Sequence, residues 1–76
     1  MAQEPIRKTI REWRTENFLT LQELADIVGV KLQTLWNWEH DRATPEFRNI
    51  RALANALAIE PRQIVLPASK RESSAD

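Results

Sequence analysis

The sequence predicts a compact all-α domain of five helices, and three observations lead to this prediction. The chain has 76 residues, enough for one hydrophobic core and no second domain. It contains one glycine and no tyrosine, so it lacks the turn and strand residues that an all-β domain would use. Its apolar residues recur at intervals of three and four, which is the spacing of a helical face.

The first helix is expected over residues 5–16, with Pro5 in a first-turn position that proline tolerates. Asn17 can adopt the left-handed conformation that ends many helices. Thr20 followed by Glu23 has the spacing of a capping box, which indicates the start of a second helix. The apolar face of the first helix consists of Ile6, Ile10 and Trp13.

The second and third helices are expected over residues 21–28 and 31–40, with Gly29 between them. So short a connection leaves no room for an antiparallel pair, so the two helices must cross at a steep angle. Ala25, one turn before the glycine, supplies the small side chain that such a crossing needs. This is the spacing of a helix-turn-helix. The buried residues of the second helix should be Leu24, Ala25 and Val28.

A fourth helix is expected to begin at Thr44 and Pro45, a cap followed by proline at the first helical position, and to end near Leu57. A short fifth helix follows over residues 61–65. Residues 67–76 are polar, rich in serine and without periodicity, so we expect a disordered tail there. The core face of the fourth helix should be Phe47, Ile50, Leu53, Ala54 and Leu57.

Composition argues against several classes of function. The chain has no cysteine and a single histidine, His40, so we expect no metal site and no other cofactor. With no cysteine, one histidine expected in a loop and no paired carboxylates in a plausible cleft, we expect no enzymatic activity. No apolar run approaches the length of a membrane span, and no signal segment is visible, so we expect a cytoplasmic protein.

The third helix has an unusual outward face. If Leu35 and Trp38 point to the core, the opposite side carries two amides, two large apolar groups and no charge. A solvated helix face normally carries lysine and glutamate, so this face is predicted to contact a partner. Glutamine and asparagine can bond adenine bidentately, and an apolar side chain can contact the thymine methyl group. The alternative occupant is a protein. The four residues are Leu32, Gln33, Trp36 and Asn37.

Several short motifs stand in register along the chain. They are Leu19-Thr20-x-Gln22-Glu23-Leu24-Ala25, Gly29-Val30, Thr34-Leu35-x-x-Trp38-Glu39, Pro45 and Leu53-Ala54-x-x-Leu57. Together they resemble the xenobiotic-response-element family, the Cro- and repressor-type helix-turn-helix DNA-binding domains of bacteria and phages. The resemblance covers about residues 6–66. It implies a lambda-repressor-like fold, a third helix in the DNA major groove, and transcriptional regulation, usually repression. The helix-turn-helix DNA-binding domain would then span residues 1–66.

The resemblance also assigns roles by register. Leu32, Gln33 and Asn37 match base-reading positions, and Trp36 either joins them, contacts sugar and phosphate, or covers the core. Arg14 and Glu39 match a largely buried ion pair between the first and third helices, which would orient the third helix. Arg42 and Arg48 have an alternative reading as ordinary solvated residues. The phosphate contacts are Gln22, Lys31, Thr34, Arg42, Thr44 and Arg48.

Three departures from the family pattern concern these contacts. Leu21 stands where the family usually has the glutamine that bonds phosphate, and Gln22 follows it. Phe18 stands where glycine is common, and Asp41 stands where glycine or asparagine often ends the third helix. The net charge is zero, with 11 basic and 11 acidic residues. These features predict modest DNA affinity with a shallow dependence on salt.

Partners follow from the same resemblance. We expect double-stranded DNA, association with the nucleoid, and a homodimer through Val65 or Leu66, where relatives often pair. The chain has no room for a separate effector domain, so no small-molecule effector is expected. The rival function is that of an antitoxin- or adapter-type protein-interaction module, which would use the same outward face of the third helix.

Overall fold

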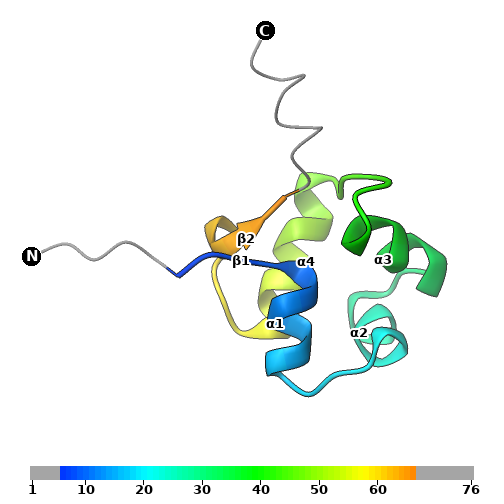
Figure 1. The fold of residues 1–76 in the computed structure, drawn as a ribbon, viewed down its shortest axis with the longest axis horizontal. Coiled ribbons are helices and arrows are strands. Elements are labelled where there is room, and N and C mark those ends of the chain that lie inside the picture. Colours follow the sequence, from blue (N-terminus) through cyan, green and yellow to red (C-terminus); the bar gives the residue numbers. More distant parts are fainter. Residues whose placement is uncertain (1–5, 67–76) are drawn as a thin grey trace, which may run out of the picture.

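The computed structural model describes residues 6–66, so the predicted tail at 67–76 lies outside the described residues. Within that range the chain forms four α-helices, one 3-10 helix and two short strands, and the all-α class is confirmed. Figure 1 shows the β1–β2 pair on one side of α4 and the α2–α3 pair on the other. The elements are β1 (Lys8–Thr9), α1 (Ile10–Glu16), α2 (Leu21–Val28), α3 (Leu32–Glu39), α4 (Phe47–Leu57), η1 (Pro61–Gln63) and β2 (Ile64–Val65).

Helix α1 begins at Ile10, later than the predicted start at residue 5. Thr9 is the N-cap: its hydroxyl accepts a hydrogen bond from the Glu12 amide at 3.2 Å. The Glu12 carboxylate in turn accepts from the Thr9 amide at 2.9 Å, which completes a capping box. This cap outweighs the proline signal, so Ile6 precedes the helix and is exposed instead of lying on its core face.

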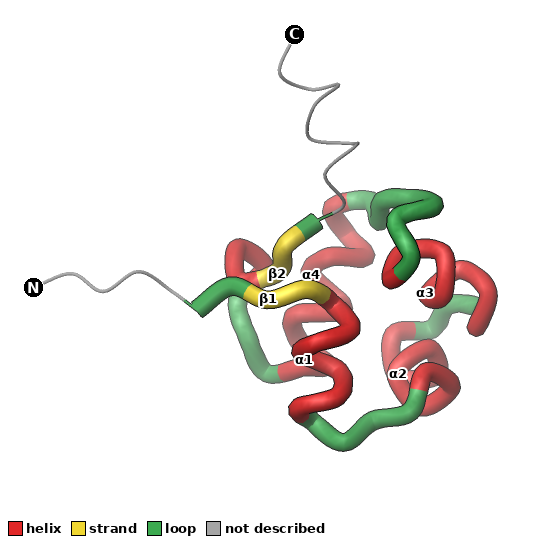
Figure 2. The backbone as a smooth tube through the Cα atoms, viewed as in Figure 1, coloured by secondary structure: helices red, strands yellow, loops and turns green. Residues whose placement is uncertain are grey.

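The predicted fifth helix is wrong beyond Gln63, where the 3-10 turn η1 ends. Ile64 and Val65 are extended because they pair in parallel with Lys8 and Thr9 of β1. Figure 2 shows these strands side by side, although they come from opposite ends of the described chain. The pairing satisfies backbone groups with partners far away in sequence, which a local helical pattern does not reveal.

Side chains reinforce this junction. The indole Nε1 of Trp13 donates a 2.8 Å hydrogen bond to the carbonyl oxygen of Gln63, and the Gln63 side-chain amide donates to the carbonyl oxygen of Ile6 at 3.1 Å. Trp13 is itself buried in the core. The tryptophan therefore contributes apolar area and a specific bond, which together hold the end of η1 against α1.

Helix α4 begins at Phe47 and not at Thr44–Pro45. Pro45 is buried in the connection that precedes the helix, and Glu46 is the N-cap. The backbone at Glu46 is still extended, with φ −69° and ψ 161°, so the predicted cap at Thr44 stands two residues before the observed one. The predicted core face of this helix is therefore wrong at its first member, because the Phe47 side chain is 66% exposed.

One hydrophobic core holds the helices together. Leu24, Leu35 and Leu53, from three different helices, are completely buried at its centre. Val28, predicted to be buried, is half-buried at its edge. No helix of residues 6–66 is long and apolar enough to cross a membrane. The buried core residues are Ile10, Trp13, Leu24, Ala25, Leu35, Trp38, Ile50, Leu53, Ala54, Leu57 and Ile64.

Positive φ angles mark the points where the chain changes direction. Asn17, predicted to be left-handed, has a φ of −90°, and the left-handed position after α1 is Phe18, at 59°. Asp41 after α3 and Ala58 after α4 both have a φ of 60°. Side chains with a Cβ adopt this region at a cost of about 1–2 kcal/mol, so each of the three turns carries backbone strain.

Replacing Phe18 by glycine tests this strain. The Phe18 side chain is 92% exposed, so its removal costs little packing. We expect Phe18→Gly to stabilise the domain by ~0.5–1 kcal/mol in urea denaturation, after the added chain entropy of glycine is subtracted. Phe18→Ala is the matched control, because alanine removes the ring and keeps the Cβ. Equal stability of the glycine and alanine variants would contradict the prediction.

Candidate nucleic-acid interface

Helices α2 and α3 form the helix-turn-helix. The Thr20 hydroxyl accepts from the Glu23 amide at 3.0 Å, and the Glu23 carboxylate accepts from the Thr20 amide at 2.8 Å. Gly29 ends α2 with a φ of 87°, and its amide donates to the carbonyl oxygen of Ala25. Ala25 is completely buried. The small side chain and the left-handed glycine together allow α3 to turn sharply away from α2.

The outward face of α3 contains two side-chain amides that bond to each other. Gln33 Nε2 donates to Asn37 Oδ1 over 3.0 Å, at a spacing of one helical turn. This bond leaves Gln33 Oε1 and the Asn37 amide nitrogen for an external partner. Leu32 and Gln33 are exposed, whereas Asn37 is half-buried. The two amides therefore present one fixed donor and acceptor pattern.

Trp36 lies in a stack that the sequence analysis did not predict. The His40 ring is nearly parallel to the Trp36 indole, at 16° with centroids 3.9 Å apart. The Arg42 guanidinium lies 5.7 Å from the Trp36 ring centroid, within cation–π range. Trp36 and His40 are four residues apart on a helix, and that spacing was the available signal. The half-buried Trp36 is covered by its own neighbours, and it holds the Arg42 charge beside the end of α3.

Candidate phosphate-binding residues occupy different environments. Lys31 is exposed at the N-cap of α3, and the side chains of Thr34 and Thr44 are half-buried. Two of the candidates have acidic partners nearby. Gln22 donates a 2.9 Å bond to Asp26, and the exposed Arg48 lies 3.7 Å from the Glu46 carboxylate. Lys31 and Arg42 lie at the two ends of α3, in positions that bracket its outward face.

The Arg14–Glu39 pair connects α1 to α3. The guanidinium donates to the carboxylate through Nε at 2.7 Å and through Nη2 at 3.1 Å, so the contact is bidentate. The remaining nitrogen, Nη1, donates to the carbonyl oxygen of Leu19 at 2.9 Å. The two side chains are 14% and 2% exposed. Each guanidinium nitrogen of Arg14 and both carboxylate oxygens of Glu39 therefore have a hydrogen-bond partner, as a buried ion pair requires.

These features define a helix-turn-helix domain. A family model described as helix-turn-helix, HTH_3, matches residues 10–64. The chain therefore belongs to this Cro/C1-type family, and the resemblance stated from the sequence motifs is confirmed. A comparison with curated protein sequences finds no match.

A solved structure shows the same fold. The crystal structure of a hypothetical transcription factor, NHTF from Neisseria, is similar with a TM-score of 0.70 and 26% sequence identity. The match covers 87% of this chain and 74% of that chain. It extends beyond the two helices of the motif to most of the described domain, so the surrounding helices are part of the shared architecture.

Removing one partner of the buried ion pair should be costly. Glu39→Ala leaves the Arg14 guanidinium buried and unmatched, and we expect a loss of ~3 kcal/mol in the free energy of unfolding. Glu16→Ala is the matched control, since it removes an exposed carboxylate paired with Lys8 and should cost about 1 kcal/mol or less. Replacing Arg14 and Glu39 together by Met and Leu should be milder than Glu39→Ala. A Glu39→Ala protein with wild-type urea stability would contradict the pairing.

Proposed function

We propose that the protein is a transcriptional regulator that binds double-stranded DNA sequence-specifically, with α3 in the major groove. One observation carries this proposal: the outward face of α3 holds Leu32, Gln33 and Asn37 and lacks charge. Family membership makes DNA the expected partner of such a face. The neighbouring crystal structure, named as a hypothetical transcription factor, supports the same class.

Base reading would use the two amides as a unit. The hydrogen bond between Gln33 and Asn37 fixes both side chains before DNA arrives, so less rotamer freedom is lost on binding. The remaining acceptor and donor match the N6 amino group and N7 of adenine. Leu32, exposed beside them, can contact a thymine methyl group. An A·T-containing half-site is therefore the expected target.

The domain would be positioned on the DNA phosphate backbone by positive charges at both ends of α3. Lys31 lies at its start, and Arg42 is held beside its end by the cation–π contact with Trp36. Arg48 would add a third contact once it leaves Glu46. Gln22, Thr34 and Thr44 would contribute hydrogen bonds to phosphate oxygens, which fix register without reading sequence.

The proposed regulator acts as a repressor by occupying its site, since a domain seated in the major groove excludes other proteins from the same base pairs. A homodimer through Val65 and Leu66, on a palindromic site, stays a prediction, and both residues are half-buried in the single chain. Selection from a random duplex pool tests the proposal. Enrichment of one sequence supports it, whereas no enrichment together with capture of a protein through α3 favours an antitoxin- or adapter-type module.

Gln33→Ala separates base reading from positioning. Because Gln33 is uncharged, its removal should cost ~1–3 kcal/mol on the selected site and leave non-specific binding almost unchanged. Preference should relax at one or two base positions in a competition assay. Arg11→Ala, an exposed change on α1, is the control that should alter neither quantity. Full retention of sequence preference by Gln33→Ala would place base reading elsewhere.

Salt dependence measures the phosphate contacts. If Lys31, Arg42 and Arg48 each neutralise a phosphate, the logarithm of the binding constant should fall with the logarithm of salt with a slope of about −3. Lys31→Ala should weaken binding to all sequences about equally and reduce the steepness by about 0.9. Fluorescence anisotropy of a labelled duplex over a potassium chloride series gives both values. A slope near zero would count against DNA as the partner.

A further inference from the structure

His40 is the only histidine of the chain, and it lies at the end of the proposed DNA-binding face. It is the C-cap of α3, three residues after Asn37 and seven after Gln33, a spacing that keeps it on the same side of the helix. Its side chain is exposed. Neither the proposed base contacts nor the proposed phosphate contacts include it.

One hydrogen bond fixes which ring nitrogen of His40 carries the proton. Nδ1 lies 2.9 Å from the carbonyl oxygen of Trp36, and a carbonyl oxygen can only accept, so Nδ1 is the donor. In the neutral ring the other nitrogen, Nε2, is then an acceptor, and it has no hydrogen-bond partner among residues 6–66. Its lone pair would repel a phosphate oxygen, whereas a protonated Nε2 would donate a hydrogen bond to one.

No negative charge is committed to His40. No carboxylate of residues 6–66 lies within ion-pair distance of its ring, although Asp41 follows it in the chain. The carboxylate of Glu39, which precedes it, accepts both of its bonds from Arg14. The helices α1 and α2, which pack against α3, have one further cation, the exposed Arg11, and four carboxylates with partners of their own. These pairs are Glu12 with Thr9, Glu16 with Lys8, Glu23 with Thr20 and Asp26 with Gln22.

Trp36 brings two cations together when His40 is protonated. The His40 ring stacks on the indole with centroids 3.9 Å apart, and the Arg42 guanidinium lies 5.7 Å from the centroid of the same indole. The indole attracts each cation, but the two positive charges repel each other. A phosphate beside them would offset this repulsion. Protonation of His40 and binding of a polyanion therefore favour each other.

We propose that His40 is a further phosphate contact that acts only in its protonated form, so that the protein takes up a proton when it binds DNA. This inference rests on the proposed function, since it needs α3 against the duplex. Histidine is the side chain that ordinarily changes charge between about pH 5 and about pH 8. Because the net charge is zero when His40 is neutral, the added proton makes the chain a cation. Binding should therefore be tighter in mildly acidic than in neutral solution.

The experiment measures fluorescence anisotropy of the selected duplex with the full chain, from about pH 5.5 to about pH 7.5 at constant ionic strength. The affinity should fall about three- to tenfold over this range, the effect of losing one charge-assisted hydrogen bond at an exposed site. A salt series at each end of the range gives a second value. The salt slope should be steeper by about 0.9 in acid, because one more phosphate is neutralised there.

His40→Gln is the matched variant, because glutamine is polar and gains no charge in this range. It should bind like the wild type in neutral solution and about three- to tenfold more weakly than the wild type in acid. His40→Arg, whose charge is permanent, should bind tightly throughout. Calorimetry in two buffers of different ionisation enthalpy should detect proton uptake by the wild type and none by His40→Gln. A dispersed amide spectrum at both ends of the range verifies that each variant is folded.

Two results would overturn the inference and leave the proposed function standing. The first is a wild-type affinity for the selected duplex that stays constant over the whole pH range. The second is a pH dependence that His40→Gln retains, since another group would then be titrating. A wild-type protein that binds no duplex at any pH in the range would instead contradict the proposed function, and this inference with it.

Discussion

The ion pair between Arg14 and Glu39 is the constraint on which the arrangement of α3 depends. Both charges are almost removed from water, so each must be matched, and the bidentate contact and the bond to the Leu19 carbonyl achieve this. The bidentate contact ties the C-terminal end of α3 to α1, and the carbonyl bond holds the chain between α1 and α2. With that end fixed, Leu35 and Trp38 enter the core, and Gln33 is left on the outside.

The sequence predicted helix boundaries correctly where a boundary is set by nearby residues and no competing cap lies close to it. The Thr20–Glu23 capping box and Gly29 bound α2 as predicted, because a cap and a left-handed glycine act within a few residues. The ends of the domain were predicted less well. Pro5 and Thr44–Pro45 both match helix-start patterns, yet Thr9 caps α1 and Pro45 is buried before α4. The pairing of Ile64 with Lys8 joins residues far apart in sequence, and no local periodicity encodes it.

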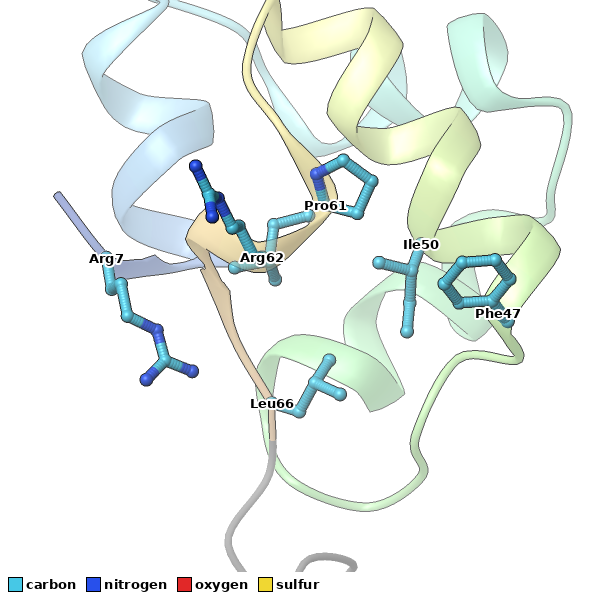
Figure 3. A pocket seen from close by; sticks show the side chains of 7 residues that line it. Arg7, Phe47, Ile50, Pro61, Arg62 and Leu66 are labelled. Atoms are coloured by element: carbon cyan, nitrogen blue, oxygen red, sulfur yellow. The ribbon is translucent and has the colours of Figure 1, made fainter. Parts of the chain in front are cut away.

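In the candidate site, the sequence predicted where single residues lie but not the contacts that they make with one another. Helical register placed Gln33 and Asn37 on one face, and the structure adds that the two amides bond to each other. The stack of His40 on Trp36 has a spacing of four, and the structure adds a 2.9 Å contact between His40 Nδ1 and the Trp36 carbonyl oxygen that the spacing alone does not predict. The apolar pocket between the start of α4 and the η1–β2 region (Figure 3) had no sequence signal, because its residues come from both ends of the described chain and from α4.

Charge placement explains how a neutral chain can suit a polyanion. The net charge is zero, so long-range attraction to DNA is weak. The outward face of α3 carries no charged side chain that would strengthen this attraction. Positive charge instead stands at the two ends of that face, at Lys31 and at Arg42, while Gln33 and Asn37 lie between. In the proposed complex the cations would set the depth and angle of α3 in the groove, and the two amides would discriminate between bases. Because the sequence-independent attraction of a neutral chain is small, sequence-specific binding as proposed would draw a larger share of its free energy from contacts that depend on base identity.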